Sequence, residues 1–201
     1  MGFTELSHAF IAAKYYVYLK EIFSDRGEAA FLHATRYYGE QRGRRMAQRA
    51  IRDGKPLTYE TYCQYGEWVN TEEVKAQGLG NQSETTSLSP DFQIHIHVCP
   101  WHTQFKNMGL PEAGLLYCKD LDASISRGFN PDIRYEVPQT LHTHDHCVQI
   151  VRNAGLTPEK KIEKYMPGVR SFEYHCAHTF WSLREVSEGI FGDEGVRASD
   201  A

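Results

Sequence analysis

The sequence predicts an α+β fold with an N-terminal helical hairpin, an antiparallel sheet packed with helices, and a C-terminal amphipathic helix. Residues 5–24 place apolar side chains every three to four positions, which is the period of a helix that buries one face. Residues 91–99 instead alternate polar and apolar side chains, as a half-buried strand does. Because helices and strands occur in separate runs, they indicate an α+β rather than an alternating α/β arrangement.

The length and composition fit a single domain, residues 1–201. Hydrophobic residues make up 41% and charged residues 24%, which is usual for a globular protein. No run of apolar residues is long enough for a membrane-spanning helix, and a net charge of −4 gives nucleic acid no general attraction. Five cysteines without a secretory signal indicate a cytoplasmic protein whose thiols are free or bind a metal.

The helical part is predicted over residues 1–69. The helix over 5–24 is followed by a second one over 28–53, which ends at an Asp-Gly pair, so the two form a hairpin. Residues 58–69 are aromatic and fit a helix or a strand. Residues 70–90 contain few large apolar side chains, which predicts a long surface loop or a lid.

The part that contains the sheet and the His/Cys cluster is predicted over residues 91–201. Eight of the ten histidines and four of the five cysteines lie between residues 95 and 178, so we expect the chemistry here. After the strand over 91–99, the expected elements are a short helix over 101–108, a helix from Pro111 to about Ser126, strands over 132–141 and 146–152, and an amphipathic helix over 171–191.

The first group of candidate ligands lies on the strand over 91–99. His95, His97 and Cys99 share one face of a strand, because successive side chains alternate between faces. Imidazole and thiolate are zinc ligands, so these side chains, followed by His102, can converge on a cation. The alternative is a strand whose second face carries polar groups in solvent.

The second group is the connection between the last two predicted strands. Such a loop can hold a metal or a general base, and an adjacent aspartate can determine the tautomer of an imidazole. The alternative is a polar hairpin loop. The side chains concerned are His142, His144, Asp145, His146 and Cys147.

The third group lies on the last predicted helix. His175 and His178 are three positions apart and are therefore neighbours on the helix surface. The pair can face a cleft between helix and sheet, or it can lie at the boundary of the core. Cys176 is expected in the core, because a free cysteine behaves as a small apolar residue.

Cys118 and a run of arginines complete the candidates. Cys118, close to Asp120 and Asp122, matters only if the fold brings it to Cys147. An arginine of the second helix can bind an anionic substrate, because guanidinium groups bind carboxylates through two hydrogen bonds. The alternative is a solvated helix face. The arginines are Arg36, Arg42, Arg44, Arg45, Arg49 and Arg52.

A series of motifs runs through residues 99–147. It reads Cys99-Pro-Trp, Gly109-Leu-Pro-Glu, Gly114, Tyr117-Cys118, Asp122, Gly128-Phe-Asn-Pro, Gln139-Thr-Leu and Asp145-His-Cys147. This series resembles the L-2-amino-thiazoline-4-carboxylic acid hydrolase family, which is spread over many bacterial proteins, and the last helix with its two histidines looks similar too. The family often has a Gly-Asp pair where this chain has Thr143-His144.

The resemblance implies a remote relation to 4-vinyl reductase and heme-NO-binding-like domains, in which helices precede a sheet covered by helices. Some of those sensor domains hold a structural zinc with cysteines, and Cys118 and Cys147 are the matching positions here. Gln139 stands near the place where a further cysteine ligand would be expected. If zinc is a cofactor, it needs a histidine or an acidic ligand instead, and we take His175 for this role.

The resemblance further implies a hydrolase that opens a small cyclic amidine, such as a 2-amino-thiazoline carboxylate, at a C–N or C–S bond. The ring carbon between nitrogen and sulfur can be attacked by water with histidine as base and acid, by a metal-bound hydroxide, or first by a thiolate. The expected catalytic residues are Cys118, Cys147, Asp145, His146, His175 and His178, and the expected substrate-binding residues are Arg44 and Arg45.

The alternative function is a non-catalytic small-molecule-binding or sensor domain, in which Cys118 and Cys147 hold a structural metal. Heme binding is a third hypothesis, because Cys99-Pro resembles a thiolate–heme dipeptide. The expected partner is a small-molecule substrate, with no nucleic acid and no membrane. A homo-oligomer is a general expectation for small enzymes of this kind.

Overall fold

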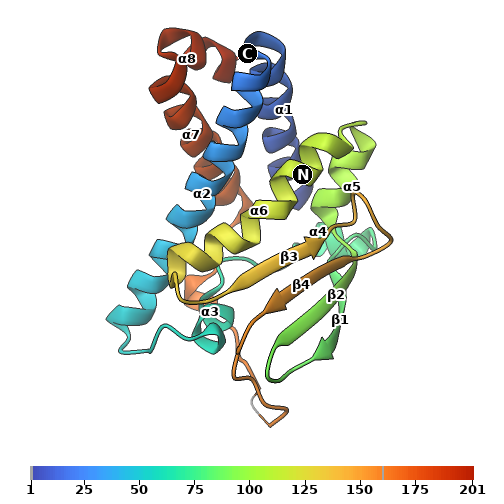
Figure 1. Ribbon diagram of the computed structural model, residues 1–201, viewed down its shortest axis with the longest axis vertical. Helices are drawn as coiled ribbons and strands as arrows, with labels where there is room; N and C mark the ends of the chain where they lie inside the picture. The colour runs from blue at the N-terminus through green and yellow to red at the C-terminus, as the bar shows by residue number, and fades with distance from the viewer. Residues whose placement is uncertain (1, 160) are drawn as a thin grey trace.

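The computed structural model describes residues 2–159 and 161–201, and it has the predicted α+β architecture. Long helices form a bundle, and a four-stranded antiparallel sheet lies beside the lower part of this bundle (Figure 1). Helix α6 (Pro111–Phe129) joins the two parts, because it contacts α2 (Asp25–Arg52) on one side and the sheet on the other.

The predicted helical hairpin is formed by α1 (Glu5–Phe23) and α2. Only Ser24, with a φ of 54°, separates the two helices. Gly27, in the first turn of α2, lies against the backbone carbonyl of Leu19, where a Cβ would overlap the carbonyl oxygen. A glycine is therefore needed for the hairpin to close this tightly.

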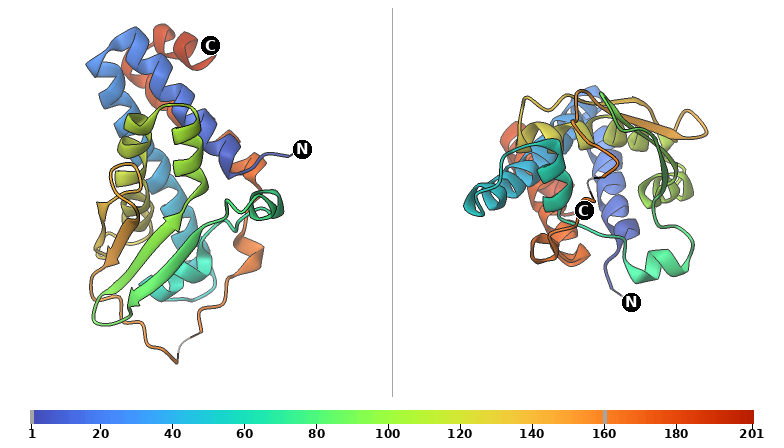
Figure 2. Two further views of the ribbon diagram at one scale, coloured as in Figure 1. Left: turned by 90° about the vertical axis from the view of Figure 1, so that its right-hand side faces the viewer. Right: turned by 90° about the horizontal axis from the view of Figure 1, so that it is seen from below.

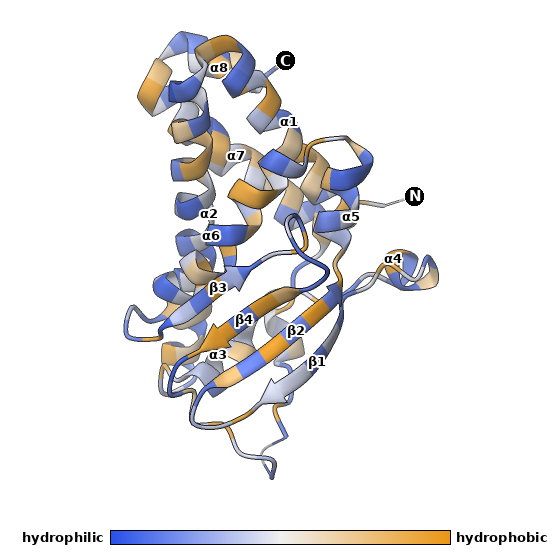
Figure 3. Ribbon diagram, turned by 45° about the vertical axis from the view of Figure 1, so that its right-hand side comes forward, coloured by the Kyte–Doolittle hydropathy of each residue, from blue (hydrophilic) through white to orange (hydrophobic). Residues whose placement is uncertain are grey.

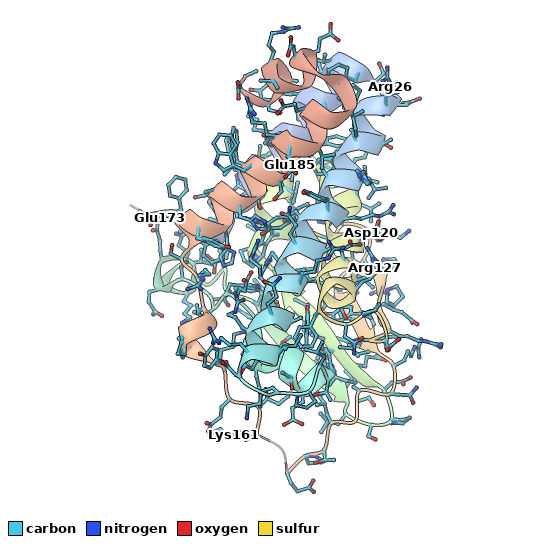
Figure 4. All side chains as sticks on the ribbon, turned by 90° about the vertical axis from the view of Figure 1, so that its left-hand side faces the viewer. Arg26, Asp120, Arg127, Lys161, Glu173 and Glu185 are labelled. Carbon is cyan, nitrogen blue, oxygen red and sulfur yellow. The ribbon has the colours of Figure 1, made fainter. Side chains whose placement is uncertain are left out.

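Helices α2 and α6 pack with their backbones in close approach. A Cβ at Gly43 of α2 would overlap the carbonyl oxygen of Ile125 in α6. Asp120 and Arg127 lie on the outer side of α6 (Figure 4), and Asp120 pairs with Arg36 of α2 at 2.7 Å. Asp120 is therefore a surface ion-pair residue and does not accompany Cys118.

The sheet has the strand order β1-β2-β4-β3, with every neighbouring pair antiparallel. Its two central strands carry the apolar side chains, whereas the edge strand β1 is polar (Figure 3). The strands are β1 (Gln82–Ser87), β2 (Phe92–Val98), β3 (Tyr135–Gln139) and β4 (Cys147–Val151).

The last long helix, α7, packs against α1 and α2 and completes the bundle. Among the helices of the described residues, none combines the length and the hydrophobicity needed to cross a membrane. The remaining elements are α3 (Tyr59–Tyr65), α4 (Glu72–Ala76), α5 (Pro100–Asn107), the 3₁₀ turn Met166–Gly168, α7 (Phe172–Phe191) and α8 (Asp193–Ser199).

The predicted loop over residues 70–90 is wrong, because this segment contains α4 and β1 and only short connections (Figure 2). β1 has no apolar side chain, so its sequence shows no apolar periodicity that would predict a strand. Its hydrogen bonds to β2 stabilise it at the edge of the sheet. That the segment over residues 70–90 acts as a lid stays a prediction. Residues 58–69 contain a helix, and α8 was not predicted.

A neutral histidine lies at the centre of the bundle. His8 of α1 is 1% exposed, and its Nδ1 accepts a hydrogen bond from Trp101 Nε1 at 2.8 Å. Its Nε2 lies 2.6 Å from the Thr179 hydroxyl and 2.9 Å from the Tyr38 hydroxyl. Burial holds the pKa of His8 well below its usual value. This network connects α1, α2, α5 and α7.

Candidate active site

A cavity of about 410 Å³ lies between the sheet and the helices α2, α5 and α6. The apolar face of β2 forms one wall with Ile94 and Ile96, and Trp68 and Trp101 form another part of the lining. The volume is typical of small-molecule sites, which measure roughly 300–1,000 Å³.

Three cysteines from three different elements line this cavity. Cys99 is the N-cap residue of α5, Cys118 lies in α6, and Cys147 begins β4. Burial raises the pKa of Cys99 to about 11 and the pKa of Cys147 to about 12. Burial, the neighbouring thiols and Asp122 hold the pKa of Cys118 well above its usual value. All three are therefore neutral thiols at neutral pH.

Among the described cavity thiols, Cys118 is the one with a hydrogen-bonding contact to a histidine ring. Its Sγ lies 3.5 Å from Nε2 of His142, which belongs to the connection between β3 and β4. Gly114, one turn before Cys118 in α6, makes room for this ring, because a Cβ at that position would overlap it. Burial lowers the pKa of His142 to about 4, so the ring is neutral, and in the tautomer protonated at Nδ1 its Nε2 accepts a hydrogen bond from the thiol.

Asp122 lies one helical turn after Cys118 and faces the same cavity. Its Oδ2 accepts a hydrogen bond from Gln149 Nε2 at 2.8 Å, and Tyr135 in turn donates to Gln149 Oε1. Burial raises the pKa of Asp122, while the charge of Arg42 and the hydrogen bond from Gln149 oppose this change. The chain Tyr135–Gln149–Asp122 therefore orients a carboxyl group that forms no ion pair with the described residues.

Arg42 is the arginine of α2 that lines the cavity. It is 4% exposed, and its Nε lies 3.4 Å from a carboxylate oxygen of the fully buried Glu67. Arg44 and Arg45, the two arginines expected to bind substrate, do not line the cavity. Arg44 is exposed and pairs with Glu40, and Arg45 pairs with Glu67 outside the cavity.

Three buried polar atoms in the cavity lining have no hydrogen-bond partner among the described residues. They are Nδ1 of His102, Nδ1 of His142 and the hydroxyl oxygen of Tyr117. The rings of His102 and His142 are 4.8 Å apart. Buried polar groups are rarely left unpaired, so these atoms are suited to hydrogen bonds with a polar ligand in the cavity.

His146 and Asp145 lie outside this cavity, on the other face of the sheet. The side chain of Asp145 is 90% exposed, and its carboxylate lies 2.6 Å from Nδ1 of His146. The His146 ring packs against His95 and His97 at 4.5 and 5.7 Å. β2 ends at Val98, so Cys99 does not share a face with the two histidines of that strand, contrary to the prediction.

His175 and His178 do not line the cavity either. His175 is 2% exposed, and its Nε2 donates to the backbone carbonyl of Glu67 at 3.2 Å. His178 contacts Gln41 and the guanidinium of Arg45. His178 therefore packs against α2 and His175 against the segment that follows α3, and neither ring is part of the cavity lining.

The residues present do not fit a structural or catalytic zinc. Within residues 2–159 and 161–201, no group of three or more His, Cys, Asp or Glu side chains has an arrangement that could hold a metal ion. Cys118 and Cys147 share a cavity, but His175 is not there, and the Gln139 side chain donates to the backbone carbonyl of His146.

We expect the protein to lose stability as the pH falls from 6.5 towards 4, because the folded state keeps the two histidines of α7 neutral. Burial lowers the pKa of His175 to about 4, and burial together with Arg45 lowers the pKa of His178 to about 3. Both rings titrate near 6.5 in the unfolded chain, so below this pH the unfolded state binds protons that the folded state does not.

The free energy of unfolding should therefore fall by about 1.4 kcal/mol per pH unit for each such ring. Urea denaturation at about pH 7, 6 and 5 measures this slope. His178→Gln should make the slope shallower. A free energy of unfolding that stays constant over this range would contradict the prediction.

The sequence named Cys99, His142, Asp122 and Arg42 within wider groups of candidates, but the expected catalytic residues included only Cys118 and Cys147 of the cavity lining. One available signal concerned the arginines. Positions 42, 45 and 49 share one face of a helix, whereas position 44 points elsewhere, so helical phase excludes Arg44 from any site that contains Arg42. No comparable signal distinguishes His142 from the neighbouring histidines of its loop.

The comparison with known families covers most of the residues that line the cavity. The family model described as L-2-amino-thiazoline-4-carboxylic acid hydrolase matches residues 4–150, which include every residue of the cavity lining except Lys164. Neither the curated proteins nor the solved structures include a match. Because the match covers well over half of the 201 residues, the chain belongs to the L-2-amino-thiazoline-4-carboxylic acid hydrolase family.

Proposed function

We propose that this chain hydrolyses a small cyclic amidine that carries a carboxylate, of the 2-amino-thiazoline-4-carboxylate type. The observation that carries the proposal is the contact between Cys118 Sγ and His142 Nε2 in a cavity lined by the family-matched residues. A nucleophile and a base within hydrogen-bonding reach are the requirement for covalent catalysis by a thiol.

Asp122 would bind the amidine. A protonated amidine presents parallel N–H groups, which a carboxylate binds through two charge-assisted hydrogen bonds. Gln149 keeps the carboxylate oriented by donating to one of its oxygens. A cation bound beside Cys118 also favours the thiolate, because an opposite charge lowers the pKa of a thiol. Substrate binding thereby helps a thiol that is neutral in the free protein to react.

The first half of the reaction transfers the amidine carbon to the enzyme. His142 accepts the thiol proton while Cys118 Sγ bonds to the ring carbon between nitrogen and sulfur. The protonated His142 then gives this proton to the ring sulfur as the ring C–S bond breaks and its electron pair goes to sulfur. The result is an isothiouronium group attached to Cys118 and a free thiol on the substrate.

The second half releases the product. Water gives a proton to His142 and bonds to the same carbon, the bond from this carbon to Cys118 Sγ breaks, and His142 returns the proton to Sγ. The product is a urea that keeps the carboxylate and the new thiol, and one proton leaves to solvent. Atoms and charge balance for an amidinium and one water molecule, without an oxidant or a reductant.

The reaction is tested by incubating the protein with 2-amino-thiazoline-4-carboxylate and measuring three products in parallel. Cleavage of the ring C–S bond releases a thiol, cleavage of the ring C–N bond releases a primary amine, and loss of the exocyclic amino group releases ammonia. We expect the thiol. Saturable binding of this compound without any of the three products would favour the sensor function instead.

The role of His142 is tested by His142→Gln with His146→Gln as the matched control. Removing the base should lower kcat by about 100-fold or more, since general acid–base catalysis contributes roughly 10²–10⁴-fold. His146 lies on the outer face of the sheet, so its variant should keep the wild-type rate. Equal losses in the two variants would refute the assignment of the base.

A further inference from the structure

Lys164 brings a positive charge to the cavity from outside the family-matched residues. It lies in the connection between β4 and α7, which runs along the bottom of the molecule in Figure 1. The match to the family ends at residue 150, yet Lys164 lines the same cavity as Cys118 and Asp122. The family likeness therefore says nothing about what this side chain does.

Gly66, the C-cap residue of α3, makes room for the ammonium group of Lys164. A Cβ at Gly66 would lie 2.6 Å from Lys164 Nζ. The φ of Gly66 is −53°, which any residue can adopt, so space and not backbone conformation favours the glycine here. Lys164 is an exposed residue of this loop, and the partial desolvation of its ammonium group lowers the pKa of that group. Lys164 thus lies at the rim of the cavity with its ammonium group against Gly66.

The charge of Lys164 is not balanced by a carboxylate of the described chain. The groups that act on it are Cys63, whose pKa burial raises to about 11, and Arg42, which repels it. Arg42 is itself paired with Glu67, whereas Lys164 makes no ion pair within residues 2–159 and 161–201. Because Lys164 lines the cavity and no carboxylate of the described residues pairs with it, its charge is available to an anionic ligand there.

We propose that Lys164 is a specificity-determining residue that selects amidines bearing a carboxylate over neutral amidines. The inference rests on the proposed function for the identity of the ring. Asp122 meets the cationic amidine and Lys164 meets the anionic carboxylate, so a zwitterionic substrate finds a complementary charge for each of its own. A neutral or purely cationic amidine leaves Lys164 without a partner.

The experiment compares two substrates in four proteins. The substrates are 2-amino-thiazoline-4-carboxylate and 2-amino-thiazoline, which lacks the carboxylate. The proteins are the wild type, Lys164→Met, Lys164→Arg and Lys161→Met. Lys161 is an exposed lysine of the same loop (Figure 4) and does not line the cavity, so Lys161→Met removes the same charge at a matched position.

We expect Lys164→Met to raise KM for the carboxylate by about 10- to 100-fold, the effect of losing one charged hydrogen bond, with kcat nearly unchanged. Its KM for 2-amino-thiazoline should equal that of the wild type. Lys164→Arg should retain most of the preference for the carboxylate, and Lys161→Met all of it. Equal losses for both substrates, or no loss for either, would overturn the role of Lys164.

The failure of the proposed function gives a different result. If the wild type binds the carboxylate without converting it, hydrolysis is refuted, and the same comparison is made with dissociation constants from calorimetry. Lys164→Met then supports the inference if it weakens binding of the carboxylate alone, and it refutes the inference otherwise. A wild type that neither binds nor converts the carboxylate refutes both proposals.

Discussion

Cys118→Ala is expected to lower kcat/KM for 2-amino-thiazoline-4-carboxylate by at least about a thousandfold, because loss of a covalent nucleophile removes the reaction path itself. Binding of the substrate should change little, since Asp122 and the two cations of the cavity remain. The measurement is thiol release under steady-state conditions, together with mass spectrometry of the wild type during turnover. The wild type should carry the mass of the isothiouronium adduct on Cys118.

Two other cysteines provide the controls for this experiment. Cys176→Ala removes a thiol that is 2% exposed in α7 and lies outside the cavity, so its effect should be on stability and not on kcat. Cys147→Ala removes a cavity thiol for which no histidine contact is present among the described residues, so most of the rate should remain. If Cys147→Ala is inactive and Cys118→Ala is active, the nucleophile is Cys147 and not Cys118.

Glu67→Gln is expected to lower the free energy of unfolding by about 3–5 kcal/mol, the usual cost of removing one partner from a buried ion pair. Glu67 is fully buried, and its carboxylate oxygens lie 2.6 Å from Arg49, 3.4 Å from Arg42 and 3.7 Å from Arg45. Burial alone would raise the pKa of Glu67, but these arginines hold the pKa below its usual value. The amide would leave three guanidinium groups without their carboxylate.

The matched control is Glu40→Gln, on the same helix as the arginines. Glu40 pairs with Arg44 at 3.3 Å and with Arg127 at 2.9 Å, but its side chain is 29% exposed. Partly exposed pairs of this kind contribute about 0–1 kcal/mol, so this variant should unfold close to the wild type in a denaturant titration. Similar losses of unfolding free energy in the two variants would mean that the buried cluster of Glu67 and its arginines stabilises the fold no more than the exposed pairs of Glu40 do.

Glu67 also connects the stability of the bundle to the cavity. Its carboxylate positions Arg42 in the cavity lining, and its backbone carbonyl accepts hydrogen bonds from His175 and from the amide of Arg170. His175 therefore contacts Glu67 at its backbone carbonyl, and His178 is connected to the Glu67 carboxylate only through Arg45. The cluster of His175, Cys176 and His178 in the sequence therefore does not correspond to a shared pocket with Cys118.

Periodicity predicted the elements that bury one face. The bounds of the helices α1 and α7 and of the strand β2 agree with the predictions within a few residues, although Phe10 and Ile22 of the apolar repeat of α1 are exposed. β1 is different, because its sequence Gln-Ser-Glu-Thr-Thr-Ser buries no apolar face and exists as a strand through its pairing with β2. Such an edge strand has no signal in its own residues.

Some residues of the candidate site could be predicted from the sequence, and others could be identified only from the structure. The motifs around Cys99, Cys118 and Cys147 pointed to the family and to the three thiols that line the cavity. The loop that follows β3 carries histidines at 142, 144 and 146, and only its folded path directs His142 to Cys118 and His146 to the outer face. A short polar loop has no period, so its sequence leaves the direction of each side chain open.

The sequence by itself determined the α+β class, the long helices, the central strand and the chemical types that gather in the second half of the chain. These features can be predicted because a helix or strand that buries one face repeats its apolar residues at a fixed spacing along the sequence. The tertiary structure alone decided which of those groups meet: Cys118 with His142, Asp122 with Gln149, and Arg42 with Glu67. These contacts join residues on different elements, so they depend on how the helices and the sheet pack and not on any local pattern.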